Sequence, residues 1–181
     1  MKRIALLIIA MLTLGFAAQA QSTFTKGTTL LNMGIGAGFT YGAKIAVPPL
    51  VLSVDHSLAD NLFDGNSSFG IGGYVAAGIT KRTYEKTTYG HQTLLAARGT
   101  LHYQFVDKLD TYWGVLLGLH IYVDPRIDIN STLYTGGETT FGPGYGSFIG
   151  GRYYLSNNWA LMIEGGYTSV TYVSLGATYR F

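Results

Sequence analysis

Two-residue alternation of apolar and polar side chains is the dominant pattern along most of this chain. Such alternation is typical of β-strands that show one apolar face and one polar face, whereas an amphipathic helix would repeat every three to four residues. We predict eight strands, at about Thr28–Phe39, Leu50–Leu58, Phe69–Thr80, Gln92–Phe105, Thr111–Val123, Gly144–Leu155, Trp159–Tyr167 and Thr171–Phe181.

The fifth segment shows the pattern most clearly. One face carries Trp113, Val115, Leu117, Leu119, Ile121 and Val123, and the other carries Tyr112, Gly114, Gly118, His120 and Tyr122. A strand that crosses a bilayer at about 45° needs about 9–11 residues, which these segments supply. No segment after the first twenty residues holds an uninterrupted apolar run long enough for a spanning helix.

The connections between these segments alternate in length. Long ones are expected at about Thr40–Pro49, Lys81–His91 and Asp124–Pro143, and short ones at Val106–Asp110 and Ser156–Asn158. Long loops outside and tight turns in the periplasm are typical of outer-membrane barrels. Two connections depart from this pattern, because Ala59–Ser68 is long for a periplasmic turn and Thr168–Val170 is short for an outer loop.

The first twenty residues predict a cleaved export signal. Lys2 and Arg3 precede an apolar stretch from Ile4 to Phe16, and Ala18-Gln19-Ala20 fits a signal-peptidase site, so that the mature chain, residues 21–181, would be a single domain. The apolar stretch of about 13 residues is too short to act as a membrane anchor, since a spanning helix needs about 20.

Composition agrees with a lipid-facing sheet. Charged residues make up 12%, about half of what soluble domains carry, while glycine (25) and tyrosine (14) are abundant. Without Lys2 and Arg3 the mature chain has 10 basic and 10 acidic residues, which gives no electrostatic reason to expect nucleic-acid binding. The chain has no cysteine, so disulfides and zinc–thiolate sites are excluded.

The last eight residues carry the most specific motif. Ser174, Gly176, Tyr179 and Phe181 fill the polar, glycine, aromatic and terminal-aromatic positions of the signal that outer-membrane barrels present to their assembly machinery. With the leader and the eight alternating strands, the mature chain resembles the small eight-stranded outer-membrane barrels of the OmpA/OmpX type, without a periplasmic domain. The resemblance implies an all-β, antiparallel, up-and-down transmembrane β-barrel in the outer membrane. It also implies outer-membrane lipid and the barrel assembly machinery as partners, and we expect a monomer.

The polar face gathers the candidate interior network: Asp55, Arg98, His102, His120, Arg152, Glu164 and Arg180. Eight strands leave an interior just wide enough for side chains, and unpaired charges there are costly, so we expect these groups to pair. Counting from the periplasmic ends of the strands places Arg98 and Glu164 near mid-barrel, where they should share a network. Asp55 and Arg152 lie three residues from the periplasmic ends of their strands and form a second level, nearer the periplasm.

These features favour a plugged structural or surface-interaction barrel, with the loop Asp124–Pro143 as the natural contact surface. The alternatives are a narrow porin-like channel for ions or small solutes, and a soluble lipocalin-like binder. Catalysis is not expected. Hairpin pairing about Val106–Asp110 places His102 beside Trp113 and His120 beside Leu95, about 20 Å apart at about 3.3 Å per residue, so the two histidines cannot share a proton or a metal. We expect no cofactor and no metal site, since the loop carboxylates lack calcium-loop spacing.

Overall fold

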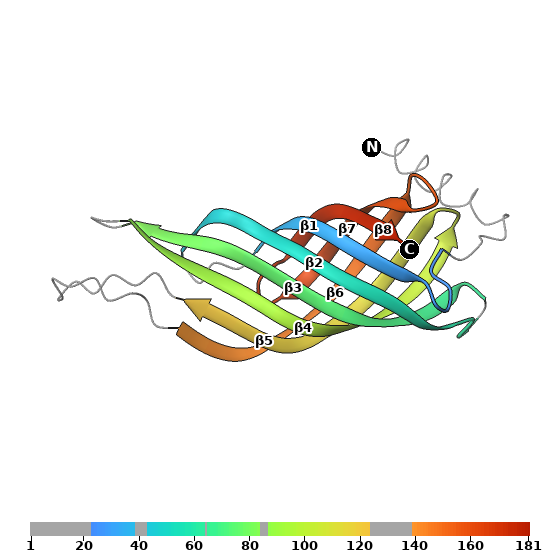
Figure 1. Ribbon diagram of the computed structural model, residues 1–181, viewed down its shortest axis with the longest axis horizontal. Helices are drawn as coiled ribbons and strands as arrows, with labels where there is room; N and C mark the ends of the chain where they lie inside the picture. The colour runs from blue at the N-terminus through green and yellow to red at the C-terminus, as the bar shows by residue number, and fades with distance from the viewer. Residues whose placement is uncertain (1–22, 39–42, 64, 84–86, 124–138) are drawn as a thin grey trace, which may run out of the picture.

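The computed structural model describes residues 23–38, 43–63, 65–83, 87–123 and 139–181. Within them eight antiparallel strands form a closed barrel in which each strand pairs with its sequence neighbours and the last strand pairs with the first (Figure 1). The strands are β1 (Thr29–Ala37), β2 (Lys44–Asp60), β3 (Ser67–Thr83), β4 (Thr87–Val106), β5 (Leu109–Val123), β6 (Thr139–Tyr154), β7 (Trp159–Thr168) and β8 (Val173–Arg180). The predicted leader, residues 1–20, lies outside the described residues.

Alternation along the strands turns apolar side chains outward. On β5, Trp113, Val115 and Leu117 are exposed, while Tyr112 and Leu116 point inward and are buried. On β2, Leu50 and Leu52 are exposed, whereas Asp55 is fully buried. The outer face is apolar and charged side chains of the strands are buried inside, which is the reverse of a soluble barrel, so the lipocalin-like alternative is wrong, and the predicted fold class is confirmed.

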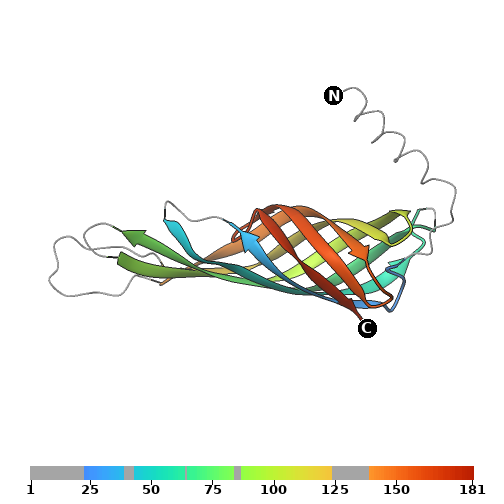
Figure 2. The same cartoon turned by 90° about the horizontal axis from the view of Figure 1, so that it is seen from above.

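The two ends of the barrel differ. We call the end with the turns β2–β3, β4–β5 and β6–β7 and with Phe181 the terminal end, and the opposite end the loop end. Strands β2 to β6 have 15–20 residues each, against 8–10 for β1, β7 and β8, and the longer strands extend beyond the others at the loop end. Figure 2 shows Phe181 at the end opposite this extension.

Three predicted loops are shorter than expected, because the strands continue into them. β2 begins at Lys44, β3 ends at Thr83 and β4 begins at Thr87, while β6 begins at Thr139. The loop predicted as Asp124–Pro143 therefore loses its last five residues to β6, and residues 124–138 lie outside the described part of the chain. The prediction was wrong here because backbone pairing continues past the apolar band, where no alternation of side chains is needed.

The predicted hairpin register of β4 and β5 was wrong by one residue. His102 pairs with Tyr112 rather than Trp113, and His120 pairs with Leu94 rather than Leu95. The cause is the two-residue turn that Lys108, at φ 64°, closes between Val106 and Leu109, together with a register shift after Tyr103. The two histidines still lie eight pairs apart, so they remain separate.

The elements of the described residues are strands. Over these residues, no helix has both the length and the apolar character that a membrane-spanning helix requires.

Candidate functional site

The lumen is filled by side chains, and its terminal half holds a charged network. Asp55 on β2 accepts from Arg152 Nη2 at 2.5 Å and from Asn32 Nδ2 at 3.0 Å, and its other oxygen lies 2.9 Å from Arg98 Nε. The carboxylate therefore bridges two guanidinium groups. All of these side chains are fully buried or nearly so, and the two expected levels of charge form one continuous network.

Arg98 extends this network towards β7. Its Nη2 donates to Glu164 Oε1 at 2.8 Å and its Nη1 donates to Ser53 Oγ at 2.9 Å. The same Glu164 oxygen accepts from the Tyr112 hydroxyl at 2.8 Å. The structure thus brings Arg98 and Glu164 together across the barrel, and Tyr112 fixes the carboxylate from a third side.

Arg152 connects the network to the terminal end. It donates through Nε to Asn32 Oδ1 at 3.1 Å and through Nη1 to Asp110 Oδ2 at 2.9 Å. Its guanidinium carbon also lies 4.0 Å from the centroid of the Tyr112 ring, a cation–π distance. Every nitrogen of the Arg152 guanidinium therefore has a partner, as a fully buried cation requires.

His102 continues the chain of contacts. Its Nδ1 lies 2.8 Å from Asp110 Oδ1, so this nitrogen donates, and its Nε2 lies 2.9 Å from Thr100 Oγ1. An acid, an imidazole and a hydroxyl in this order resemble the relay of nucleophilic enzymes. Here all three groups are buried, because Thr100, His102 and Asp110 are at most 2% exposed.

Phe24 closes the terminal end of the lumen over His102. The two ring centroids are 4.0 Å apart, and Phe24 is 1% exposed. Neighbouring contacts hold the segment in place, because Thr23 N donates to Gln104 Oε1 at 2.6 Å and Arg180 Nη1 donates to Thr23 O at 3.2 Å. We call residues 23–28 the stopper, since they also bond β2 through Gly27 N to Ser57 O.

The loop half of the lumen is filled by apolar side chains. Val51, Tyr74, Leu94, Leu116, Phe148 and Val170 belong to one buried cluster. Val170 comes from the short β7–β8 connection, which folds inward, and Thr171 beside it lies 3.3 Å from the Tyr74 hydroxyl. The Thr168–Val170 connection, which is short for an outer loop, therefore closes the barrel from the loop side.

The predicted network residues are thus divided. Asp55, Arg98, His102, Arg152 and Glu164 meet in one network, whereas Arg180 stays at the terminal rim, with its guanidinium over the Tyr154 ring at 5.1 Å. His120 lies apart, near the loop end. Sequence reasoning missed Asn32, Asp110 and Phe24. The inward parity of Asn32 is a usable signal, whereas Asp110 falls in a predicted turn and Phe24 precedes the first predicted strand, where no pattern marks it.

The four residues of the terminal motif lie on β8 and at its end. Ser174 and Gly176 face inward, and a Cβ atom at Gly176 would overlap the backbone oxygen of Met33 on β1. The glycine therefore lets β8 approach β1 where the barrel closes. Tyr179 faces outward and packs against Trp159 and Phe181, with ring centroids 5.0 Å apart in both pairs.

The donor chemistry of the network does not suit a metal ion. Its carboxylates are already paired with guanidinium groups, and the described residues contain no cluster of three or more metal-binding side chains.

No family model matches this chain, and no curated protein sequence matches it. Solved structures do. The Ail protein of Yersinia pestis in complex with the heparin analogue sucrose octasulfate is 15% identical, with a TM-score of 0.53 over 87% of this chain and 100% of that one. A second Ail crystal structure is 14% identical, with a TM-score of 0.51 over the same shares. The N-terminal β-barrel domain of Pseudomonas aeruginosa OprF is 14% identical, with a TM-score of 0.50 over 86% of this chain and 98% of that one.

The fold is therefore that of the small eight-stranded outer-membrane β-barrels, and the proteins that share it are outer-membrane proteins. At these identities the likeness concerns the fold alone, and any activity has to be argued from the residues of this chain.

Proposed function

We propose that this protein is an integral outer-membrane β-barrel with a closed lumen, which serves as a structural or surface-interaction scaffold and not as an enzyme or an open pore. Its loop end would face the outside and its terminal end the periplasm. In this account residues 1–20 are removed on export, and the assembly machinery recognises Ser174, Gly176, Tyr179 and Phe181. The folded barrel is a monomer.

Two aromatic levels on the outer face support the membrane setting. Near the loop end, the Tyr167 ring lies 5.7 Å from Tyr145 and 6.1 Å from Tyr172. Near the terminal end, Trp159, Tyr179 and Phe181 pack together. Amphipathic rings at two levels are typical of the two interfaces of a bilayer.

The apolar band between these levels has a suitable height. On β3, outward apolar residues run from Phe69 to Ile79, and Lys81 follows. Ten residues at about 3.3 Å each, tilted by about 40°, rise about 25 Å, which matches the apolar band of outer-membrane barrels. The band therefore fits the hydrocarbon region, and Lys81 would lie at its outer boundary.

The closed lumen is the observation that favours a scaffold over a channel. The stopper, the charged network and the apolar cluster with Val170 follow one another along the barrel. An ion would have to displace buried side chains in each of the three layers, and in the charged network it would also have to break ion pairs.

An ion-flux experiment tests this choice. The folded protein is reconstituted in liposomes loaded with potassium, and potassium release is compared with that from empty liposomes. The scaffold proposal predicts equal release, and a steady protein-dependent release would favour the narrow channel. Fractionation of cells tests the location, and recovery of the folded protein in a detergent-free soluble fraction would contradict the membrane proposal.

A further inference from the structure

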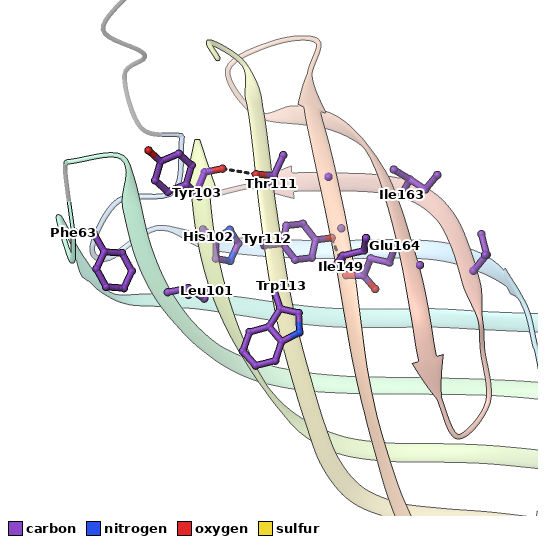
Figure 3. A pocket seen from close by; sticks show the side chains of 14 residues that line it. Phe63, Leu101, His102, Tyr103, Thr111, Tyr112, Trp113, Ile149, Ile163 and Glu164 are labelled. Carbon is purple, nitrogen blue, oxygen red and sulfur yellow. Dashed lines mark hydrogen bonds between the residues drawn. The ribbon is translucent and has the colours of Figure 1, made fainter. Parts of the chain in front are cut away.

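An oblique groove crosses the outer face of the barrel from β4 to β8. It lies between two neighbouring rows of outward side chains, and its floor is the backbone of the inward row between them (Figure 3). Strand pairing defines the two rows as Tyr103–Thr111–Gly151–Ile163 and Leu101–Trp113–Ile149–Gly165–Val173, with His102, Tyr112, Gly150 and Glu164 as the floor. The cavity volume is about 620 Å³.

Small residues account for the hollow. A Cβ atom added at Gly151 or Gly165 would meet no atom within 4 Å, so both positions open onto the outer surface. Their cross-strand neighbours Ile163 and Ile149 are more than half exposed and form walls on either side. A volume of this size falls within the range of about 300–1,000 Å³ that is usual for ligand sites.

The lining suits an apolar ligand. The two outward polar groups of β5 in the groove are already engaged, because Thr111 Oγ1 donates to Tyr103 O and Trp113 Nε1 donates to Ser147 Oγ at 3.1 Å. The ionisable side chains of the floor, His102 and Glu164, are buried in the lumen network. A ligand in the groove therefore meets mainly hydrocarbon and ring surfaces.

The direction of the groove fits one leaflet of a bilayer. Four strand spacings of about 4.8 Å make it about 19 Å long, and a strand tilt of about 40° makes it climb about 12 Å. That climb is about half of an apolar band of about 25 Å. The groove starts at Phe63 and Tyr103 near the terminal end and rises towards Val173 on β8.

We propose that this groove binds a single acyl chain of a phospholipid from the leaflet at the terminal end of the barrel. The proposal rests on the membrane setting proposed above. A second copy of the chain fits less well. A groove one row of side chains wide, roughly 20 Å by 7 Å, covers about 140 Å² on each partner, far below the roughly 800 Å² that a stable interface buries.

Tryptophan fluorescence gives a direct test, because Trp113 lines the groove and Trp159, the other of the two tryptophans, lies outside it. The folded Trp159→Phe variant in non-quenching detergent is titrated with phosphatidylethanolamine that carries brominated chains. Quenching of Trp113 should saturate near one lipid per protein. The Trp113→Phe variant, which reports Trp159, should show only gradual quenching that does not saturate.

A groove-filling variant provides the second arm. The double variant Gly151→Leu with Gly165→Leu, in the Trp159→Phe background, should raise the lipid concentration that gives half-maximal quenching at least tenfold. Gly73→Leu is the matched control, since Gly73 also opens outward on β3 but does not line the groove, and it should leave the titration unchanged. Thr111→Phe fills the groove from β5 and replaces the double variant if that one does not fold, as judged by heat-modifiable gel mobility.

Three results would overturn the proposal. They are unsaturable quenching of Trp113, equal quenching in the filled and control variants, or a change from dimer to monomer in sedimentation when the groove is filled. The last result would assign the groove to a second copy. Failure of the membrane setting itself would be recognised separately, as a folded protein that is soluble without detergent.

Discussion

Replacing Arg152 by methionine should destabilise the barrel strongly, because Arg152 joins three parts of the lumen network. The side chain is fully buried and donates to Asp55, Asp110 and Asn32. Methionine keeps most of the volume but leaves two carboxylates without that partner.

The expected magnitude follows from what each carboxylate retains. Breaking a buried ion pair by removing one partner costs about 3–5 kcal/mol. Asp55 keeps Arg98 and Asp110 keeps His102, so the lower end applies. We expect the free energy of unfolding to fall by about 3 kcal/mol, which is a factor of about 150 in the folding equilibrium.

Urea unfolding in detergent micelles, followed by tryptophan fluorescence, measures this change as a lower midpoint at unchanged slope. Arg180→Met is the matched control. Its guanidinium lies at the rim with one hydrogen bond to Thr23 O, so the loss should stay within about 1 kcal/mol. In the double variant Arg152→Met with Asp110→Asn, the loss should be smaller than the sum of the two single losses. Equal midpoints for Arg152→Met and Arg180→Met would refute the network as a source of stability.

Three further outcomes are expected. Phe24→Ala should open the terminal end of the lumen. Thr100→Cys introduces the only cysteine of the chain as a reporter. Its thiol should react with a small thiol reagent when Phe24→Ala is also present and stay protected when Phe24 is retained. If the thiol reacts equally with and without Phe24, then Phe24 does not close the lumen. Gly72→Ala should prevent barrel closure, because its Cβ atom would overlap Val54 O, whereas Gly73→Ala next to it should fold normally; heat-modifiable mobility compares the two. Removing Phe181 should lower the folded fraction in cellular membranes without changing refolding of the purified chain, and an equal loss in both settings would contradict a role in assembly.

The sequence predicts the faces of the strands well and their ends poorly. On β5 the outward set from Trp113 onward is correct, because a closed barrel gives each strand one lumen face and one outer face, which imposes a strict period of two. At the loop end that constraint is absent, and strands such as β6, which begins at Thr139, continue without a pattern. The register error at His102 came from a turn whose geometry depends on one residue, Lys108, at positive φ.

The lumen network can likewise be predicted only in part from the sequence. Charge on the inward face identifies Asp55, Arg98, Arg152 and Glu164, since buried charges need partners. Their connection into one network depends on strand stagger, which counting along single strands does not give. The stopper residue Phe24 precedes the first strand and carries no periodic signal, so only the three-dimensional structure places it over His102.

Single-channel recording in a planar bilayer tests the central claim most directly. The folded wild-type protein, inserted through detergent dilution and verified by gel mobility, should give no discrete conductance steps across the range of potentials that the bilayer tolerates. Reproducible steps of constant size that remain open for long periods would contradict a lumen closed by the stopper, the charged network and the apolar cluster.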